Sequence, residues 1–165
     1  MTLPDGFYFH LYKYKLYARE DSKKEHLLHS LNSLLFPFSV LFLFLDEFKG
    51  IYLWFGVFLT LISLVIEFMD VFEENKSRKS IGGLISIEYA MHFAMSALRG
   101  IYTTLILVSK PNSDWLLTKK YSPFVFSELS AAHFFIFSVV IIGVLVAILH
   151  FSLISYKNSN SKEIK

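Results

Sequence analysis

The stretch that decides the fold is residues 51–72, IYLWFGVFLTLISLVIEFMDVF, an apolar run in which acidic side chains appear only toward the end. A helix needs roughly 20 mainly apolar residues to cross about 30 Å of hydrocarbon, and this run has that length. Because backbone groups find no water in lipid, they must pair within the segment, which leaves the α-helix as the expected state. The sequence therefore predicts a membrane-spanning helix here.

Three further stretches pass the same test and bring the chain to four predicted spans. They cover residues 27–45, with Pro37 as a potential kink, residues 84–108 and residues 126–149. Composition agrees, because 54% of the 165 residues are hydrophobic and 18 are Phe, more apolar surface than a soluble domain of this size hides. The predicted fold class is an all-α membrane protein, a bundle of four transmembrane helices formed by residues 23–156.

The predicted membrane domain carries a different kind of segment at each end. Residues 1–22 interleave aromatic side chains with lysines, a combination typical of the headgroup layer. They are predicted to form an interfacial arm, for which a short surface helix and a strand both remain open. Residues 157–165 are polar and are predicted to form a disordered tail.

Lysine and arginine are distributed unevenly between the two sides of the predicted bundle. Most of them lie on the side that holds both termini and the loop at residues 73–83. The opposite side has only Lys49, Lys110, Lys119 and Lys120. The positive-inside rule therefore predicts a multi-pass protein with its N- and C-termini in the cytoplasm.

Several classes of function are excluded by composition and motifs. A net charge of only +2 gives no electrostatic basis for binding nucleic acid. The absence of cysteine excludes disulfides, thiol catalysis and Cys-based zinc sites. There is no phosphate-binding glycine loop or dinucleotide fingerprint, and the pair Gly82-Gly83 indicates a tight turn instead.

Polar side chains inside the predicted spans recur at helical spacing, so that each helix has one polar face. The third span carries Glu88, His92, Met95, Arg99 and Tyr102 on one face. Its other face has small residues that permit close helix approach, which predicts that this helix lies in the interior of the bundle. The second span carries Gly56, Thr60, Ser63, Glu67, Asp70 and Glu74 on one face.

Successive spans run in opposite directions, so ionisable residues from all four are predicted to share one layer near the cytoplasmic face. These residues are Glu25, His26, His29, Glu67, Asp70, Glu74, Glu88, His92 and His150. Glu67 and Glu88 lie about four residues inside their spans, roughly 6 Å at the helical rise. Charge buried at that depth is costly unless it is paired or bound.

Carboxylates and imidazoles projecting inward from facing helices are typical of bundles that bind metal ions. Mixed Glu, Asp and His ligation suits iron, manganese or zinc. The predicted metal ligands are His29, Glu67, Asp70, Glu88, His92 and His150. Haem between His92 and His150 is also conceivable, although haem ligation needs none of the carboxylates.

For some of these residues a purely structural interpretation competes with the metal. Asp70, Glu73 and Glu74 are expected to be solvated beside the basic residues Lys76, Arg78 and Lys79. Arg99, near mid-bilayer, is expected to pair with a group from another helix or to hold an anionic part of a substrate. His133 is predicted to lie near the opposite face, away from the cluster.

The leading hypothesis from the sequence is a metal-dependent membrane enzyme that acts on a lipid or isoprenoid substrate. Its predicted catalytic residues are Glu67, Glu88, His92 and Arg99. The alternative is a non-enzymatic protein, either a small carrier or a binding or assembly partner, in which the cluster relays protons or ions or forms structural pairs. A carrier with four spans would have to form a homo-oligomer to enclose a path.

Overall fold

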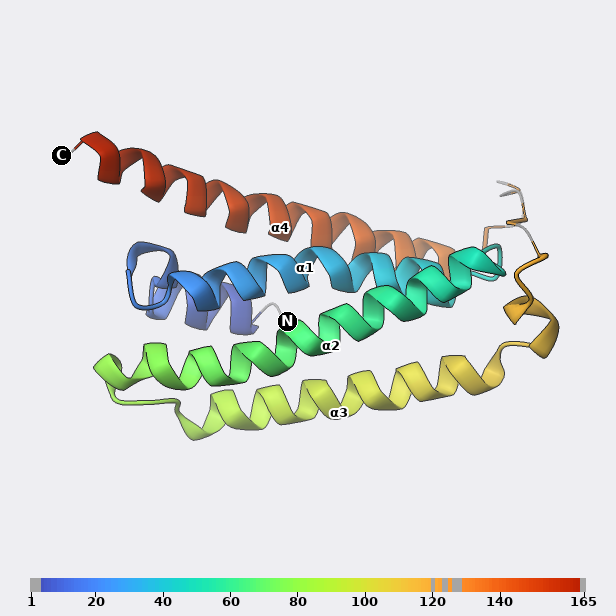
Figure 1. Cartoon of the computed structure of the whole chain (residues 1–165), viewed down its shortest axis with the longest axis horizontal. Helices are drawn as coiled ribbons and strands as arrows, with labels where there is room; N and C mark the ends of the chain where they lie inside the picture. Colours follow the sequence, from blue (N-terminus) through green and yellow to red (C-terminus); the bar gives the residue numbers. More distant parts are fainter. Residues whose placement is uncertain (1–3, 120, 123–124, 126–128, 164–165) are drawn as a thin grey trace.

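All regular structure is helical in the part of the chain that the computed structural model describes, residues 4–119, 121–122, 125 and 129–163 (Figure 1). The long helices are α1 (Lys23–Phe44), α2 (Ile51–Ser77), α3 (Ser86–Ser109) and α4 (Ala131–Glu163). The shorter helical segments are η1 (Pro4–Lys13), η2 (Leu16–Ala18), η3 (Arg78–Ile81) and η4 (Asn112–Trp115). The predicted all-α bundle of four helices is confirmed.

The surface and the interior of the bundle have the polarity expected of a membrane protein. Each of the four long helices is long and apolar enough to cross a membrane. Large apolar side chains such as Phe68, Phe93 and Ile141 are exposed, whereas the buried side chains are more often polar than apolar. A bundle that is apolar outside and polar inside is suited to lipid as its solvent. The chain therefore has the architecture of a multi-pass membrane protein.

Helix α1 lies between α2 and α4 and packs against both (Figure 1). Glycines stand at two close approaches, because Gly56 of α2 faces Phe42 and Leu43, and Gly143 of α4 faces the ring of Pro37. A Cβ added at Gly143 would stand 2.6 Å from Pro37 Cγ, and one at Gly56 would stand 2.9 Å from Phe42 Cβ. Both crossings depend on the missing side chain.

Helix α3 lies at the edge of the bundle, beside α2 (Figure 1). The prediction that it is an interior helix is wrong. The small residues expected to form its contact face are exposed; they are Ser86, Ala90, Ala94, Ala97 and Gly100. Small side chains permit close approach without specifying a partner, and α3 contacts α2 through long polar side chains instead.

Two helices extend beyond their predicted ends. Helix α2 continues past Phe72 to Ser77, and α4 continues to Glu163, so the predicted disordered tail is helical up to that residue. The hydrocarbon thickness sets a minimum length for a span and no maximum. The predicted start of the fourth span at residues 126–128 lies outside the described residues, and the helix begins at Ala131.

The close contact of Gly143 at the α1–α4 crossing generates a prediction about stability. We expect Gly143→Ala to lower stability by about 1–3 kcal/mol, because the new methyl group would overlap the rigid Pro37 ring. The matched control is Gly100→Ala, where an added Cβ meets nothing within 4 Å. There the gain in helix propensity should leave stability unchanged or slightly raised. Thermal unfolding in detergent measures the stability of both variants. Equal shifts in their melting temperatures would contradict the close contact between Gly143 and Pro37.

Candidate functional site

Arg78 is the centre of a buried polar cluster at the end of the bundle where α2 and α3 are joined. Its side chain is 0% exposed, and its Nη2 lies 3.0 Å from Glu25 Oε1, 3.4 Å from Glu88 Oε1 and 3.7 Å from Glu74 Oε1. These carboxylates come from α1, α3 and α2. The ring of Tyr14 lies against the guanidinium, 4.3 Å from Arg78 Cζ to the ring centroid, and its hydroxyl donates to Glu88 Oε2 at 3.0 Å.

Local structure explains why Arg78 and Glu88 meet. Gly82 and Gly83 have φ of +93° and +87°, the left-handed region that glycine occupies without strain, and Gly83 N donates to Arg78 O at 2.8 Å. This confirms the predicted tight turn. It places Glu88 in the first turn of α3, where its carboxylate accepts a hydrogen bond from Ile85 N at 3.3 Å and the helix dipole favours negative charge.

Four side chains beside Arg78 converge in the manner of a metal site. His10, Glu25, His29 and Glu74 are all buried, and each offers one ligand atom within 4.8 Å of the others. His10 Nε2 lies 3.9 Å from Glu25 Oε1 and 4.0 Å from Glu74 Oε1. The rings of His10 and His29 meet edge to face with 3.9 Å between centroids. We call these four residues the His/Glu quartet.

Further polar contacts join the quartet to α2 and α3. His29 Nε2 lies 2.8 Å from Asp70 Oδ2, and His92 Nε2 lies 3.1 Å from Glu74 Oε1. Asp70 therefore contacts His29, and His92 contacts Glu74, and both His29 and Glu74 belong to the quartet. Asp70 and His92 therefore lie beside the quartet and are placed to hold the side chains of His29 and Glu74 in position.

A second group of polar contacts lies deeper in the bundle, between α1, α2 and α3. Arg99 Nη1 lies 2.7 Å from Glu67 Oε2, and Ser96 Oγ donates to Glu67 Oε1 at 2.5 Å. Arg99 Nη1 also donates to Ser63 Oγ at 2.9 Å, and Ser63 in turn donates to Asn32 Oδ1. Arg99 thus has its partner on another helix, as the sequence predicts, and that partner is Glu67.

The cluster at the end of the bundle contains more acid than permanent base. Its carboxylates are those of Glu25, Asp70, Glu74 and Glu88, and Arg78 is the guanidinium among them. In a poorly solvated interior each uncompensated charge is expensive. The surplus negative charge must be balanced by a bound cation or by protonation of imidazoles or carboxylates.

His10 reaches this cluster from the N-terminal arm, which packs on the bundle through this buried side chain. Burial lowers the pKa of His10 well below its ordinary value, and the neighbouring His29, Arg78, His92 and His150 lower it further. His10 is therefore a neutral imidazole at neutral pH. That is the form in which histidine binds a metal.

The structure divides the six predicted metal ligands into distinct groups. His29 belongs to the quartet, and Asp70, Glu88 and His92 lie around it. Glu67 lies outside the quartet against Arg99 and Ser96. His150 packs against His26, with 4.9 Å between ring centroids. Among the four predicted catalytic residues, Glu88 and His92 therefore border the quartet, whereas Glu67 and Arg99 pair with each other.

Several residues of the cluster have roles that sequence reasoning missed. Asp70 and Glu74 are buried, and so is Arg78, so the expectation that they are solvated is wrong; Glu73 does pair with Lys24 and Lys76 at the surface. The four-residue spacing between Glu74 and Arg78 was the available signal, because it puts both on one helix face. For His10 the signal was weaker, since nothing in the arm indicated what it packs against.

His133 lies at the opposite end of the bundle, as predicted. Its Nε2 is 2.7 Å from Glu47 Oε1, and its Nδ1 accepts from Ser130 N at 3.1 Å. These contacts tie the start of α4 to the loop after α1 and are separate from the quartet. His133 is therefore a useful control residue.

Comparison with known proteins gives no match: no protein-family model, no curated protein and no solved structure resembles the chain. Its function is therefore inferred from the geometry and chemistry of its own side chains.

The pair formed by Glu67 and Arg99 generates a prediction about the attachment of α3. Arg99→Met should lower stability by about 1–3 kcal/mol, because it removes the partner of the half-buried Glu67 and of the buried Ser63. The double variant Glu67→Met/Arg99→Met should cost less than the two single variants together, since it removes both charges. Thermal unfolding of the wild type, the two single variants and the double variant in the same detergent gives a double-mutant cycle. Additive losses would show that the two side chains do not interact.

Proposed function

We propose that this protein is a multi-pass membrane enzyme that holds a divalent iron, manganese or zinc ion in its His/Glu quartet and acts on a lipid substrate. The observation that carries the proposal is the convergence of four buried ligand atoms from the arm, α1 and α2, within 4.8 Å of one another. The distribution of lysine and arginine supports a cytoplasmic location for this end of the bundle.

The dimensions and the donor set of the quartet fit such an ion. Metal–ligand bonds of about 2.0–2.2 Å allow two ligands of one ion to stand at most about 4.4 Å apart. Side-chain movements of less than an ångström would therefore close the quartet around a metal. Two imidazoles and two carboxylates suit these metals, and a dication would offset much of the surplus negative charge.

The neighbouring side chains have supporting roles in this proposal. Asp70 holds the orientation of the His29 ring, as a carboxylate beside a ligating histidine commonly does. Arg78 contacts Glu25 and Glu74 and helps to fix their positions, and His92 approaches Glu74 from α3. When bound, the metal would supply a Lewis acid that polarises a substrate bond or activates water or oxygen.

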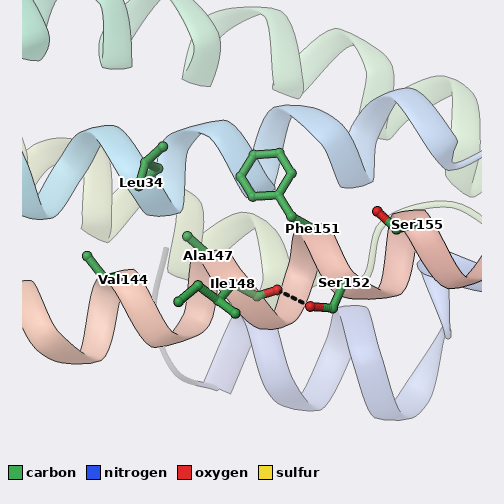
Figure 2. A pocket seen from close by; sticks show the side chains of 7 residues that line it. All are labelled: Leu34, Val144, Ala147, Ile148, Phe151, Ser152 and Ser155. Atoms are coloured by element: carbon green, nitrogen blue, oxygen red, sulfur yellow. Dashed lines mark hydrogen bonds between the residues drawn. The ribbon is translucent and has the colours of Figure 1, made fainter.

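An apolar crevice between α1 and α4 supports a lipid as the substrate (Figure 2). It has a volume of about 540 Å³ and is lined by Leu34, Val144, Ala147, Ile148, Phe151, Ser152 and Ser155. Two residues of this lining, Ala147 and Phe151, lie within one helical turn of His150 along α4. A hydrocarbon chain entering from the bilayer would fit its mainly apolar lining.

A second recess continues the crevice toward the end of the bundle. It is lined by Glu20, Asp21, Lys23, Lys24, Leu27 and Ile154. Leu27 and Leu34 are two helical turns apart on the same face of α1, so the two recesses follow one line. Charged groups at one end and apolar groups along the rest match an amphipathic molecule with a polar head and a long chain.

Metal analysis tests the quartet. The purified protein, loaded with Mn²⁺ and freed of excess ion, should retain the metal, and His29→Ala and Glu74→Gln should each lower its affinity about tenfold or more. Two controls should retain the wild-type metal content: His133→Ala, which removes a distant histidine, and Glu67→Gln, which alters a carboxylate outside the quartet. Loss of metal in Glu67→Gln but not in Glu74→Gln would show that the quartet is not the metal site.

Substrate turnover is a separate test. Metal-loaded protein incubated with a total membrane-lipid extract should change the mass of one lipid class, because the apolar crevice would admit a lipid from the bilayer. Mass spectrometry follows the change, which should disappear in metal-free protein and in Glu74→Gln while persisting in His133→Ala. A lipid profile that stays the same in the presence and absence of metal would remove the enzymatic part of the proposal.

A proton or ion relay is the second candidate, and the deeper polar contacts favour it. Glu67, Arg99, Ser63 and Asn32 form a second set of polar contacts deeper in the bundle, which would supply further steps of a relay. A folded protein that binds no metal but collapses a pH gradient across liposomes would support this candidate. Glu67→Gln should then slow the collapse.

A further inference from the structure

The N-terminal arm contributes one quartet residue from outside the four long helices. His10 lies in η1, which folds back alongside the start of α1 (Figure 1), and its Nε2 stands 3.9 Å from Glu25 Oε1 and 4.0 Å from Glu74 Oε1. The other three quartet residues, Glu25, His29 and Glu74, are carried by α1 and α2 themselves. The quartet is therefore complete only while the arm is docked.

Two polar side chains of the arm contact the cluster. His10 is 0% exposed, and Tyr14 donates to Glu88 Oε2 while its ring lies against Arg78. Tyr12, by contrast, is 74% exposed. Docking that depends on contacts with ionisable groups responds to any change in their charge. The position of the arm is therefore coupled to what the cluster binds.

Docking places the neutral ring of His10 against the carboxylates of Glu25 and Glu74. The ring excludes water from them but brings no counter-charge, and the guanidinium of Arg78 cannot balance every carboxylate of the cluster. Keeping uncompensated charge away from water is costly. A divalent ion in the quartet removes that cost and bonds the imidazole directly. Because a ligand stabilises the state that it binds, the ion favours the docked arm.

The backbone between η1 and η2 has the form of a hinge. Lys15 has φ of +49° and ψ of +50°, and it is the only non-glycine residue with positive φ among those that the structure describes. A side chain is strained in this region, and the conformation persists only where contacts on both sides impose it. Here those contacts are His10 and Tyr14 on one side and Leu16, which is 0% exposed, on the other. Release of the arm would let Lys15 relax.

We infer that the arm is a strap that closes over the cluster when the quartet binds its metal ion. With the ion bound, His10 is a ligand and the arm is held against Glu25 and Glu74. Without the ion, the arm exchanges between docked and open positions about Lys15, and the open position admits the metal. This inference rests on the proposed function, because the ion that closes the strap is the one in the His/Glu quartet.

The distance between two nitroxide labels tests the inference on the full-length protein in liposomes. The chain contains no cysteine, so Tyr12→Cys in the arm and Lys79→Cys in η3, both at exposed positions, can be labelled selectively. Zinc is the probe because Zn²⁺ is diamagnetic and leaves the nitroxide signals undisturbed. Double electron–electron resonance should give one narrow distance distribution with Zn²⁺ bound. After a chelator removes the ion, the distribution should become broad and extend to longer distances.

Two variants at the hinge form a matched pair. Lys15→Pro fixes φ at about −65° and so excludes the docked turn. Its distance distribution should stay broad in Zn²⁺, and its affinity for Zn²⁺ should fall about tenfold or more, because the undocked arm withholds one ligand. Lys15→Asn removes the same side chain but tolerates positive φ. It should match the wild type in both measurements.

Metal content and distances together separate this inference from the proposed function. Bound Zn²⁺ with the same distance distribution before and after chelation, narrow or broad, would overturn the strap and leave metal binding standing. A narrow distribution in Lys15→Pro would overturn the hinge. No bound Zn²⁺ in the wild type would remove the proposed function and the strap together. If Lys15→Pro does not fold, as judged by size exclusion, the wild type with and without Zn²⁺ decides.

Discussion

A buried guanidinium must be compensated where it stands, and the arrangement of the end of the bundle where α2 and α3 are joined follows from that requirement. Arg78 cannot lose its charge, so it requires carboxylates close by. Those carboxylates, Glu25, Glu74 and Glu88, come from three different helices. Satisfying one side chain therefore fixes the relative positions of α1, α2 and α3. It also makes the region a concentration of negative charge, into which the arm inserts His10.

The helices are held together in two different ways, and each has a consequence for the site. Helix α1 approaches α4 and α2 closely where glycines remove the side-chain volume, at Gly143 and Gly56. Helix α3 is attached to α2 through polar groups, chiefly Arg99 on Glu67 and His92 on Glu74. The first kind of contact is rigid packing. The second depends on the same ionisable groups that make up the cluster, so changes in their charge bear directly on the position of α3.

Histidines give the cluster its chemical character. Five of the six histidines in the chain lie at this end: His10, His26, His29, His92 and His150. Carboxylates balanced only by arginine would form a static network of ion pairs. Imidazoles among them can bind a metal ion or exchange a proton at neutral pH, which makes the region a candidate for chemistry as well as for packing.

The sequence by itself determined the four helices and the gathering of ionisable groups at one end. Span length, apolar content and the alternation of direction are properties that each segment carries with it. Only the tertiary structure decided the partners: Glu67 pairs with Arg99, Arg78 is buried, and His10 joins the quartet. Helical periodicity shows which residues share a face, but not which helix that face meets. That depends on approaches such as Gly143 against Pro37, between residues far apart in the chain, and so α3 lies at the edge where its pattern predicted an interior helix.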